Sequence, residues 1–262
     1  MACRLFSWLG IRSRFKNPLK QIAFYDSNPE RLGNIEANII ISQNGSYHAI
    51  SEITNLKALH VVRDPRDVIV SSYFSYRYSH AINDWKELAS LRNKLNKVSF
   101  DEGLFHLIDF NKGMFQNLKT WNYNDERILE LRFEEVIKDP IKYLIMAIMH
   151  FELLKSSSVL DDRKTYIQGK INRGFRKLGV YPYLKFKGSA VSENYIKREL
   201  VKLSFDKLAK GRKRGSVNQK SHYRKGVSNE WKDLFNQEHK DYFKEVYGDL
   251  VVQLGYEPDN NW

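Results

Sequence analysis

At 262 residues and 42% hydrophobic content, the chain can bury one large core, and no linker rich in Pro, Gly or Ser divides it. We therefore expect a single domain over residues 1–262, and the formal charge of +12 favours an anionic partner. Cys3 is the only cysteine, which excludes an intramolecular disulfide and a cysteine zinc cluster and favours a reducing, cytoplasmic compartment.

The N-terminal stretch MACRLFSWLGIRSRF has too short an apolar section for a signal peptide, and no segment approaches 18 uncharged apolar residues. We expect a soluble protein without a transmembrane segment. Two short runs rich in β-branched residues, Asn38–Ser42 and Ala58–Val62, predict strands that are covered on both faces, and Arg127–Leu131 is a third strand candidate.

Longer segments with helical spacing separate these strands. Apolar residues at spacings of three and four from Phe100 to Trp121 predict one long amphipathic helix. Asp139 and Pro140 are a cap and a first-turn proline, so they predict a buried helix after Pro140. A last helix is expected after a Ser228 cap. This alternation predicts an α/β fold.

The segment from Lys207 to Lys225, KLAKGRKRGSVNQKSHYRK, is basic, contains glycines and has no apolar period. We expect residues 207–227 to form a flexible basic loop. Two interpretations stay open, a solvated basic surface and a flap that covers a ligand. Nucleic-acid binding through GRKRG is a third, although no nucleic-acid motif accompanies it and no nucleic-acid partner is expected.

An anion site is predicted where the strand Ala58–Val62 ends. Arg63 follows that strand, at the edge where open parallel sheets bind ligands. Asp64, Pro65 and Asp67 are explained by the start of a helix. The helix N-terminus, the Arg63 guanidinium and the Ser71 hydroxyl together suit one phosphate. The alternative is that Arg63 pairs with Asp67 and that Ser71 is merely small.

Three segments resemble the sulfotransferases that use 3′-phosphoadenosine-5′-phosphosulfate (PAPS). RDPRDVIVSS is similar to their 3′-phosphate motif, with Arg63 and Ser71 at the matching positions. YRKGVSNEWK resembles their C-terminal R-K-G element, so that Arg224, Lys225 and Gly226 are expected to close over the same phosphate. LRFEEVIKDP resembles the segment whose tyrosine touches adenine, and Phe133 stands at that position.

The resemblance implies a three-layer sandwich with a central parallel sheet, the P-loop NTPase-like sulfotransferase fold. The family's N-terminal loop, P-K-S-G-T-T-W, binds the 5′-phosphosulfate, and the nearest register pairs Ser13 and Arg14 with part of it. In that register Arg12 replaces a glycine and Gly10 stands at the lysine position. Residues 1–37 are therefore expected to be a divergent or truncated donor-binding region.

Sulfuryl transfer needs a base for the acceptor hydroxyl, and the family's histidine falls in the stretch that matches NIIISQNGSYHAI. His48 is the histidine of this stretch, while a tighter alignment puts Gln43 or Asn44 at the position. The resemblance implies transfer from PAPS to a small-molecule or carbohydrate hydroxyl or an amine, without a metal. The alternative is a protein that binds adenosine 3′,5′-bisphosphate without transfer.

Overall fold

A computed structural model of the chain describes residues 22–26, 39–43, 45–54, 56–82, 85–152, 163–164, 166–168, 170–171, 174–175, 178, 193–201, 204–221 and 223–262. The chain forms two compact units, and each is described by itself. One unit contains Met1–Val61 and Asn122–Leu203, and the other contains Val62–Trp121 and Ser204–Trp262. The single domain expected over residues 1–262 stays a prediction.

The first unit carries the strands, which form two two-stranded sheets among the described residues. Strands β1 (Ile22–Asp26) and β2 (Ile39–Gln43) are parallel, with Ile22 opposite Ile39. Strands β3 (Ala58–Val62) and β4 (Ile128–Arg132) form the other pair. The three predicted strands are confirmed to within one residue, whereas β1 was not predicted. The expected cover on both faces was wrong for β3, because Val61 is 46% exposed.

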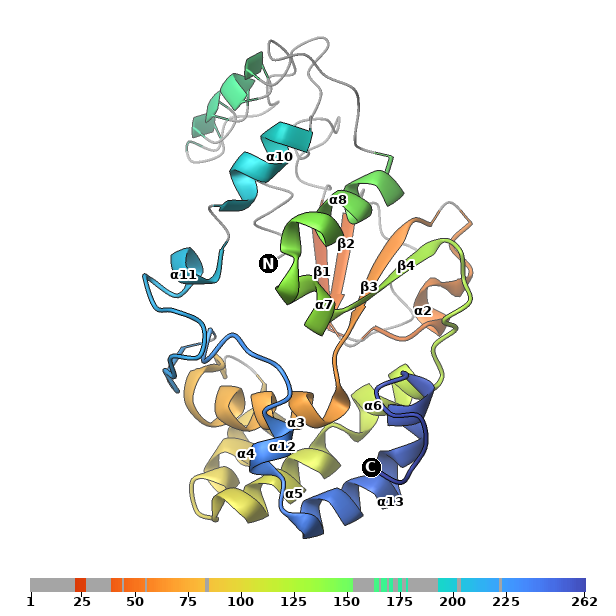
Figure 1. Ribbon diagram of the computed structural model, residues 1–262, viewed down its shortest axis with the longest axis vertical. Coiled ribbons are helices and arrows are strands. Elements are labelled where there is room, and N and C mark those ends of the chain that lie inside the picture. The colour runs from red at the N-terminus through yellow and green to blue at the C-terminus, as the bar shows by residue number, and fades with distance from the viewer. Residues whose placement is uncertain are drawn as a thin grey trace. The chain divides into compact units, whose positions relative to one another are not determined.

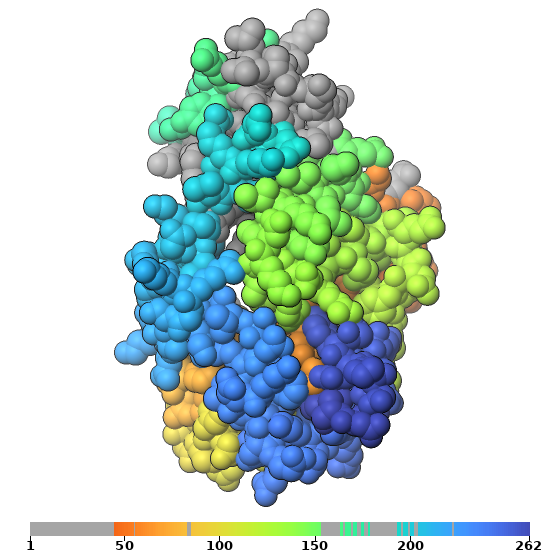
Figure 2. All heavy atoms as spheres, in the orientation of Figure 1, coloured from red at the N-terminus to blue at the C-terminus, as the bar shows by residue number. Residues whose placement is uncertain are grey.

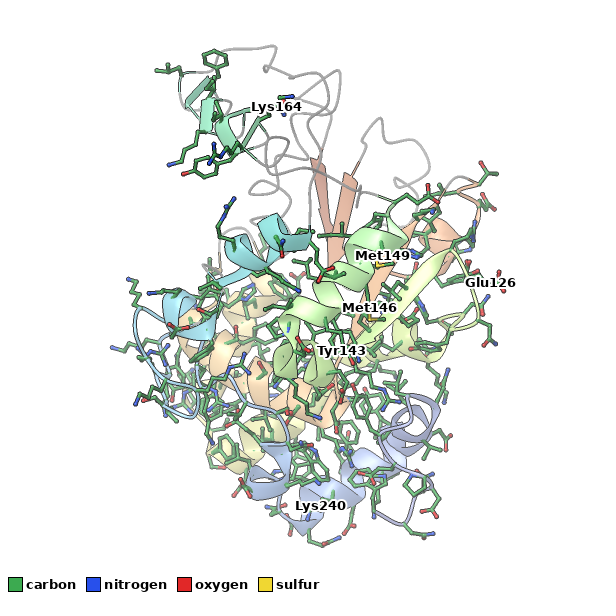
Figure 3. The ribbon with its side chains drawn as sticks, turned by 45° about the horizontal axis from the view of Figure 1, so that its top comes forward. Glu126, Tyr143, Met146, Met149, Lys164 and Lys240 are labelled. Carbon is green, nitrogen blue, oxygen red and sulfur yellow. The ribbon has the colours of Figure 1, made fainter. Side chains whose placement is uncertain are left out.

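Helices of the first unit complete the α/β pattern (Figure 1), and those with described bounds are α2 (His48–Ser51), α7 (Phe133–Lys138), α8 (Pro140–His150) and α10 (Glu193–Leu200). Helix α8 begins as predicted, because the Asp139 side chain accepts a hydrogen bond from the Lys142 backbone N–H at 3.0 Å. The prediction that α8 is a buried helix was wrong for one of its faces. Met146 and Met149, labelled on α8 in Figure 3, are 37% and 58% exposed.

The second unit is helical in its described residues. Its elements are α3 (Pro65–Phe74), the π-helical turn η4 (Ser75–Ser79), α4 (Lys86–Leu95), α5 (Phe100–Phe110), α6 (Lys112–Lys119), α11 (Phe205–Leu208), α12 (Trp231–Leu234) and α13 (Gln237–Gln253). Helix α5 packs against both α3 and α13 (Figure 1). The core lies between these helices and includes Ile69, Tyr73, Leu104, Leu107, Ile108, Phe243, Leu250 and Val251.

The predicted long helix from Phe100 to Trp121 is two helices, since α5 ends before Asn111 and α6 begins after it. The buried Asn111 side chain donates to the Leu107 carbonyl oxygen at 2.8 Å. An asparagine that bonds back to the preceding turn competes with the regular helical pattern, which explains the interruption.

The prediction that Ser228 caps the last helix was also wrong. Helix α12 starts at Trp231, and a second break follows at Phe235 in extended backbone. Helix α13 then starts from Asn236, whose side chain accepts a hydrogen bond from the His239 backbone N–H at 2.9 Å. Because the helix restarts there, its buried face differs from the predicted stripe, and Val246 is 39% exposed.

Candidate anion site

The first part of the candidate site is the turn from β3 into α3. Arg63 follows β3, and the Asp64 side chain accepts a hydrogen bond from the Arg66 backbone N–H at 2.9 Å. Pro65 occupies the first turn of α3. The predicted helix start is therefore confirmed for Asp64 and Pro65, and it carries Arg63 directly in front of the N-terminus of α3.

Asp67 does more than favour the start of the helix. Its side chain is fully buried, and its Oδ2 atom lies 3.5 Å from Nη2 of Arg63. The same carboxylate accepts hydrogen bonds from the backbone N–H groups of Asn229, at 2.6 Å, and Trp231, at 3.1 Å. Burial raises the pKa of Asp67 above its ordinary value, while Arg63 and the two N–H groups oppose that rise. Asp67 thus joins α3 to the segment that precedes α12.

A second contact joins the same two segments further along α3. The guanidinium carbon of Arg224 lies 4.2 Å from the centroid of the Phe74 ring, a distance typical of a cation–π contact. Half-buried Ser71 follows Asp67 by one helical turn and precedes Phe74 by three residues. Because residues three and four apart share a helix face, Ser71 lies on the face of α3 that meets the C-terminal segment.

Sequence reasoning missed the acid that faces the predicted basic residues. The carboxylate of Glu230 forms ion pairs with Arg224 and, at 3.2 Å, with Lys225, and its side chain is only 8% exposed. A signal was present, because Glu230 is the first acidic residue after Asp206 in a very basic stretch. Arg63, Arg224 and Lys225 carry three positive charges against two from Asp67 and Glu230, which leaves one net positive charge.

Gly226 is required by both conformation and space. Its φ of +73° lies in the region that side chains rarely adopt, and a Cβ atom there would lie 2.4 Å from Cε2 of Phe205. The backbone at Gly226 therefore packs closely on Phe205 of α11. This close approach was not predicted from the sequence, where the glycine was noted only through the family motif.

The basic loop is organised around Arg212 rather than presenting it to solvent. Its guanidinium donates hydrogen bonds to the carbonyl oxygens of Ser216 and Arg224, both at 3.0 Å. It also donates to the Tyr223 carbonyl oxygen, at 2.6 Å, and to Oγ of Ser221, at 3.1 Å. Neighbouring side chains such as Lys213 are exposed, and the loop lies at the surface of its unit (Figure 2). Its predicted flexibility is not tested by these contacts.

The remaining predicted residues belong to the first unit. His48 begins the short helix α2 and is exposed, and its carbonyl oxygen accepts a hydrogen bond from Oγ of Ser51 at 3.1 Å. Phe133 is the half-buried first residue of α7. Ser13 and Arg14, with the rest of residues 1–21, lie outside the described residues, as does Asn44.

One further histidine has an acidic partner. Nδ1 of His60, on β3, lies 2.7 Å from Oε2 of Glu130, on β4. Among the residues that the structure describes, no group of three or more His, Cys, Asp and Glu side chains could hold a metal ion. In the same residues, no helix is both long and apolar enough to cross a membrane.

These two units define an α/β protein with a candidate anion site at the N-terminal half of α3. Residues 11–169 match the family model of the sulfotransferase domain. The match spans more than half of the chain, so the chain belongs to the sulfotransferase domain family, and the predicted family, transferase class and α/β sulfotransferase fold are confirmed. The matched region contains Arg63, Ser71 and His48 but ends before Arg224.

Among solved structures, the chain is similar to one described as the crystal structure of mouse sulfotransferase SULT7A1 complexed with PAP. The two chains are 14% identical, the TM-score is 0.48, and the alignment covers 95% of this chain and 81% of that chain. No curated protein matches the sequence.

Proposed function

We propose that this protein transfers a sulfuryl group from PAPS to a hydroxyl or amine acceptor. Arg63, Ser71 and the Arg224–Gly226 segment hold the 3′-phosphate of the donor. Phe133 packs on the adenine, and His48 takes the proton of the acceptor. Membership of the sulfotransferase family supports the reaction class, and the contacts within the second unit support the phosphate site.

One observation carries this proposal. Two segments separated by about 160 residues, each of which resembles a 3′-phosphate element, meet on one face of α3. Asp67 joins them near Arg63, and the contact between Arg224 and Phe74 joins them beyond Ser71. A phosphate bound at Ser71 would therefore lie on the same face of α3 as guanidinium groups from both segments, Arg63 from one and Arg224 from the other.

The residues present suit a phosphate. Arginine guanidinium groups bind phosphate oxygens through paired, charge-assisted hydrogen bonds, and the N-terminus of α3 adds positive potential. Glu230 and Asp67 form ion pairs with the three basic side chains and so hold them in place before a ligand binds. Because the cluster has one net positive charge, it favours an anion without the strong repulsion that three bare cations would create.

When bound, PAPS supplies an activated sulfuryl group on a phosphate leaving group. The acceptor oxygen or nitrogen forms a bond to sulfur while the bond from sulfur to the phosphate oxygen breaks, and the leaving phosphate keeps the electron pair of that bond. His48 accepts the proton that the acceptor loses. Ser13 and Arg14 are proposed to contact the 5′-side of the donor, and support for them is the sequence register alone.

Titration calorimetry with adenosine 3′,5′-bisphosphate and with adenosine 5′-monophosphate tests the phosphate site. We expect the bisphosphate to bind at least about tenfold more tightly, because only it offers a 3′-phosphate to Arg63 and Arg224. Arg63→Ala should remove most of this preference. Equal affinity for the two nucleotides, or no binding of either, would refute the proposed site.

Incubation with radiolabelled PAPS and a panel of small-molecule, carbohydrate and amine acceptors tests turnover. Labelled product supports the transferase, and His48→Ala should abolish it while leaving bisphosphate affinity unchanged. Tight bisphosphate binding with no labelled product favours instead a binding protein without transfer. The specific reason to keep this alternative is the donor loop, where Arg12 replaces the glycine of the family's pattern. A cytoplasmic location is also part of the proposal, and it rests on the single cysteine.

A further inference from the structure

Asp67 has an arrangement that the start of a helix does not require. An acidic residue in the first turn favours helix formation from an exposed position, through the helix dipole. Here Asp64 already caps α3, whereas Asp67 is fully buried, and each of its carboxylate oxygens accepts a hydrogen bond from a backbone N–H group outside α3. Such burial costs free energy unless the partners of the carboxylate compensate for it.

The partners of Asp67 come from both predicted phosphate elements. Oδ2 faces Nη2 of Arg63 at 3.5 Å and accepts the Asn229 N–H at 2.6 Å, while Oδ1 accepts the Trp231 N–H at 3.1 Å. Asn229 has a φ of +64°, a conformation that is uncommon for residues other than glycine but that asparagine adopts more readily than most, and its bond to Asp67 helps to hold it. Glu230, between these two residues, carries the ion pairs to Arg224 and Lys225.

We propose that Asp67 is a positioning residue for the 3′-phosphate of the donor, because it aligns Arg63 with its charge and fixes the backbone on both sides of Glu230. The inference rests on the proposed function. Through Arg63 it acts on the first phosphate element. Through the Asn229–Trp231 backbone and Glu230 it sets where Arg224 and Lys225 lie.

An asparagine at position 67 separates charge from shape. The amide has nearly the same size, but one carboxylate oxygen becomes an N–H₂ group that can only donate. That donor faces either Arg63 or a backbone N–H group, both of which are donors themselves. Asp67→Asn therefore removes the alignment of Arg63, the hold on one backbone N–H group, or both, while it leaves the volume of the buried site almost unchanged.

The test is a double-mutant cycle in which adenosine 3′,5′-bisphosphate is titrated into wild type, Asp67→Asn, Arg63→Gln and the double variant. We expect Asp67→Asn to weaken binding about tenfold or more, and the loss in the double variant to be clearly smaller than the product of the two single losses. Unchanged affinity in Asp67→Asn, or losses that multiply, would overturn the inference.

Glu102→Ala is the matched control for stability, because alanine removes the side-chain acceptor of the capping box. Glu102 belongs to the capping box of α5, where its side chain accepts from the Ser99 backbone N–H at 3.1 Å. It should lower the melting temperature of the same unit without changing bisphosphate affinity. If this control loses as much affinity as Asp67→Asn at a similar loss of stability, then Asp67 has only a structural role and the inference fails.

Hydrogen exchange provides a measurement that leaves Asp67 in place. In Arg63→Gln without nucleotide, the Asn229 and Trp231 amides should exchange several-fold faster than in wild type, because their acceptor has lost its charged partner. Unchanged exchange contradicts the coupling whether or not Asp67→Asn folds. Wild type that fails to bind the bisphosphate refutes the proposed function and the inference together, whereas binding that Asp67→Asn leaves intact refutes the inference alone.

Discussion

Replacing Gly226 with alanine is the sharpest test of the predicted phosphate segment, because the structure separates two costs. The first is conformational, since an L-residue at a φ of +73° loses about 1–2 kcal/mol. The second is steric. The new Cβ atom would lie 2.4, 2.6 and 2.8 Å from three atoms of the Phe205 ring, far inside ordinary contact. Overpacking of this kind typically costs about 1–3 kcal/mol.

Gly215→Ala is the matched control within the same loop. Gly215 also has a positive φ, +90°, but a Cβ atom there would meet nothing within 4 Å. Gly215→Ala should therefore show the conformational cost alone. The difference in destabilisation between the two variants isolates the steric contact with Phe205. We expect this difference to be about 1–3 kcal/mol in the free energy of ordering the segment.

Calorimetry with adenosine 3′,5′-bisphosphate and thermal unfolding measure the two effects. If about 2 kcal/mol of the summed conformational and steric cost destabilises the conformation that binds the nucleotide, Gly226→Ala lowers the affinity for the bisphosphate about 30-fold. Phe205→Leu in the Gly226→Ala background should recover the steric part and leave the conformational part. Equal losses of affinity in Gly226→Ala and Gly215→Ala would refute the close packing of this segment on Phe205.

Two further predictions concern the Arg212 contacts and the acid stability of the first unit. In Arg212→Lys, the lysine cannot replace the planar guanidinium that donates hydrogen bonds to four oxygens. The backbone amides of Gly215 and Asn218 should therefore exchange their hydrogens about tenfold faster or more. Unchanged exchange rates would contradict this role of Arg212. Hydrogen bonds from Arg127 hold the pKa of Asp125 well below its ordinary 3.8, so the pair stabilises the fold above about pH 4 and less as pH falls. Asp125→Asn should flatten the fall of melting temperature below pH 4, and an equally steep fall would exclude this pair as its cause.

The sequence predicted the local features of the site well. The apolar run before Arg63 is bounded by polar residues on both sides, so strand β3 was predicted with its observed bounds. The order of Asp64 and Pro65 similarly predicted the start of α3. These features depend on neighbouring residues only, so helix caps and short strands can be predicted directly from the local sequence.

Features that depend on distant partners were not predicted. Helical spacing alone suggested continuous helices through Asn111 and Phe235, yet a side-chain bond interrupts the first and extended backbone the second. Asp67 was explained by its position in the first helical turn or, alternatively, by a pair with Arg63, which is observed, but its two backbone partners lie more than 160 residues away. A single sequence carries no local sign of such a pairing.

The same limit applies to the charges of the site. Within the motif segments, Arg63, Arg224 and Lys225 were assigned to the phosphate, whereas Asp67 was assigned to the helix start or to a pair with Arg63, and Glu230 had no assigned role. Two buried carboxylates, Asp67 and Glu230, determine where those cations lie, because a desolvated acid must take up nearby positive partners. A chain with the motif cations but without these acids would have a higher positive charge and less order at the same site. The proposed affinity for a 3′-phosphate should therefore depend on both sets, whereas the motifs alone predicted only the cations.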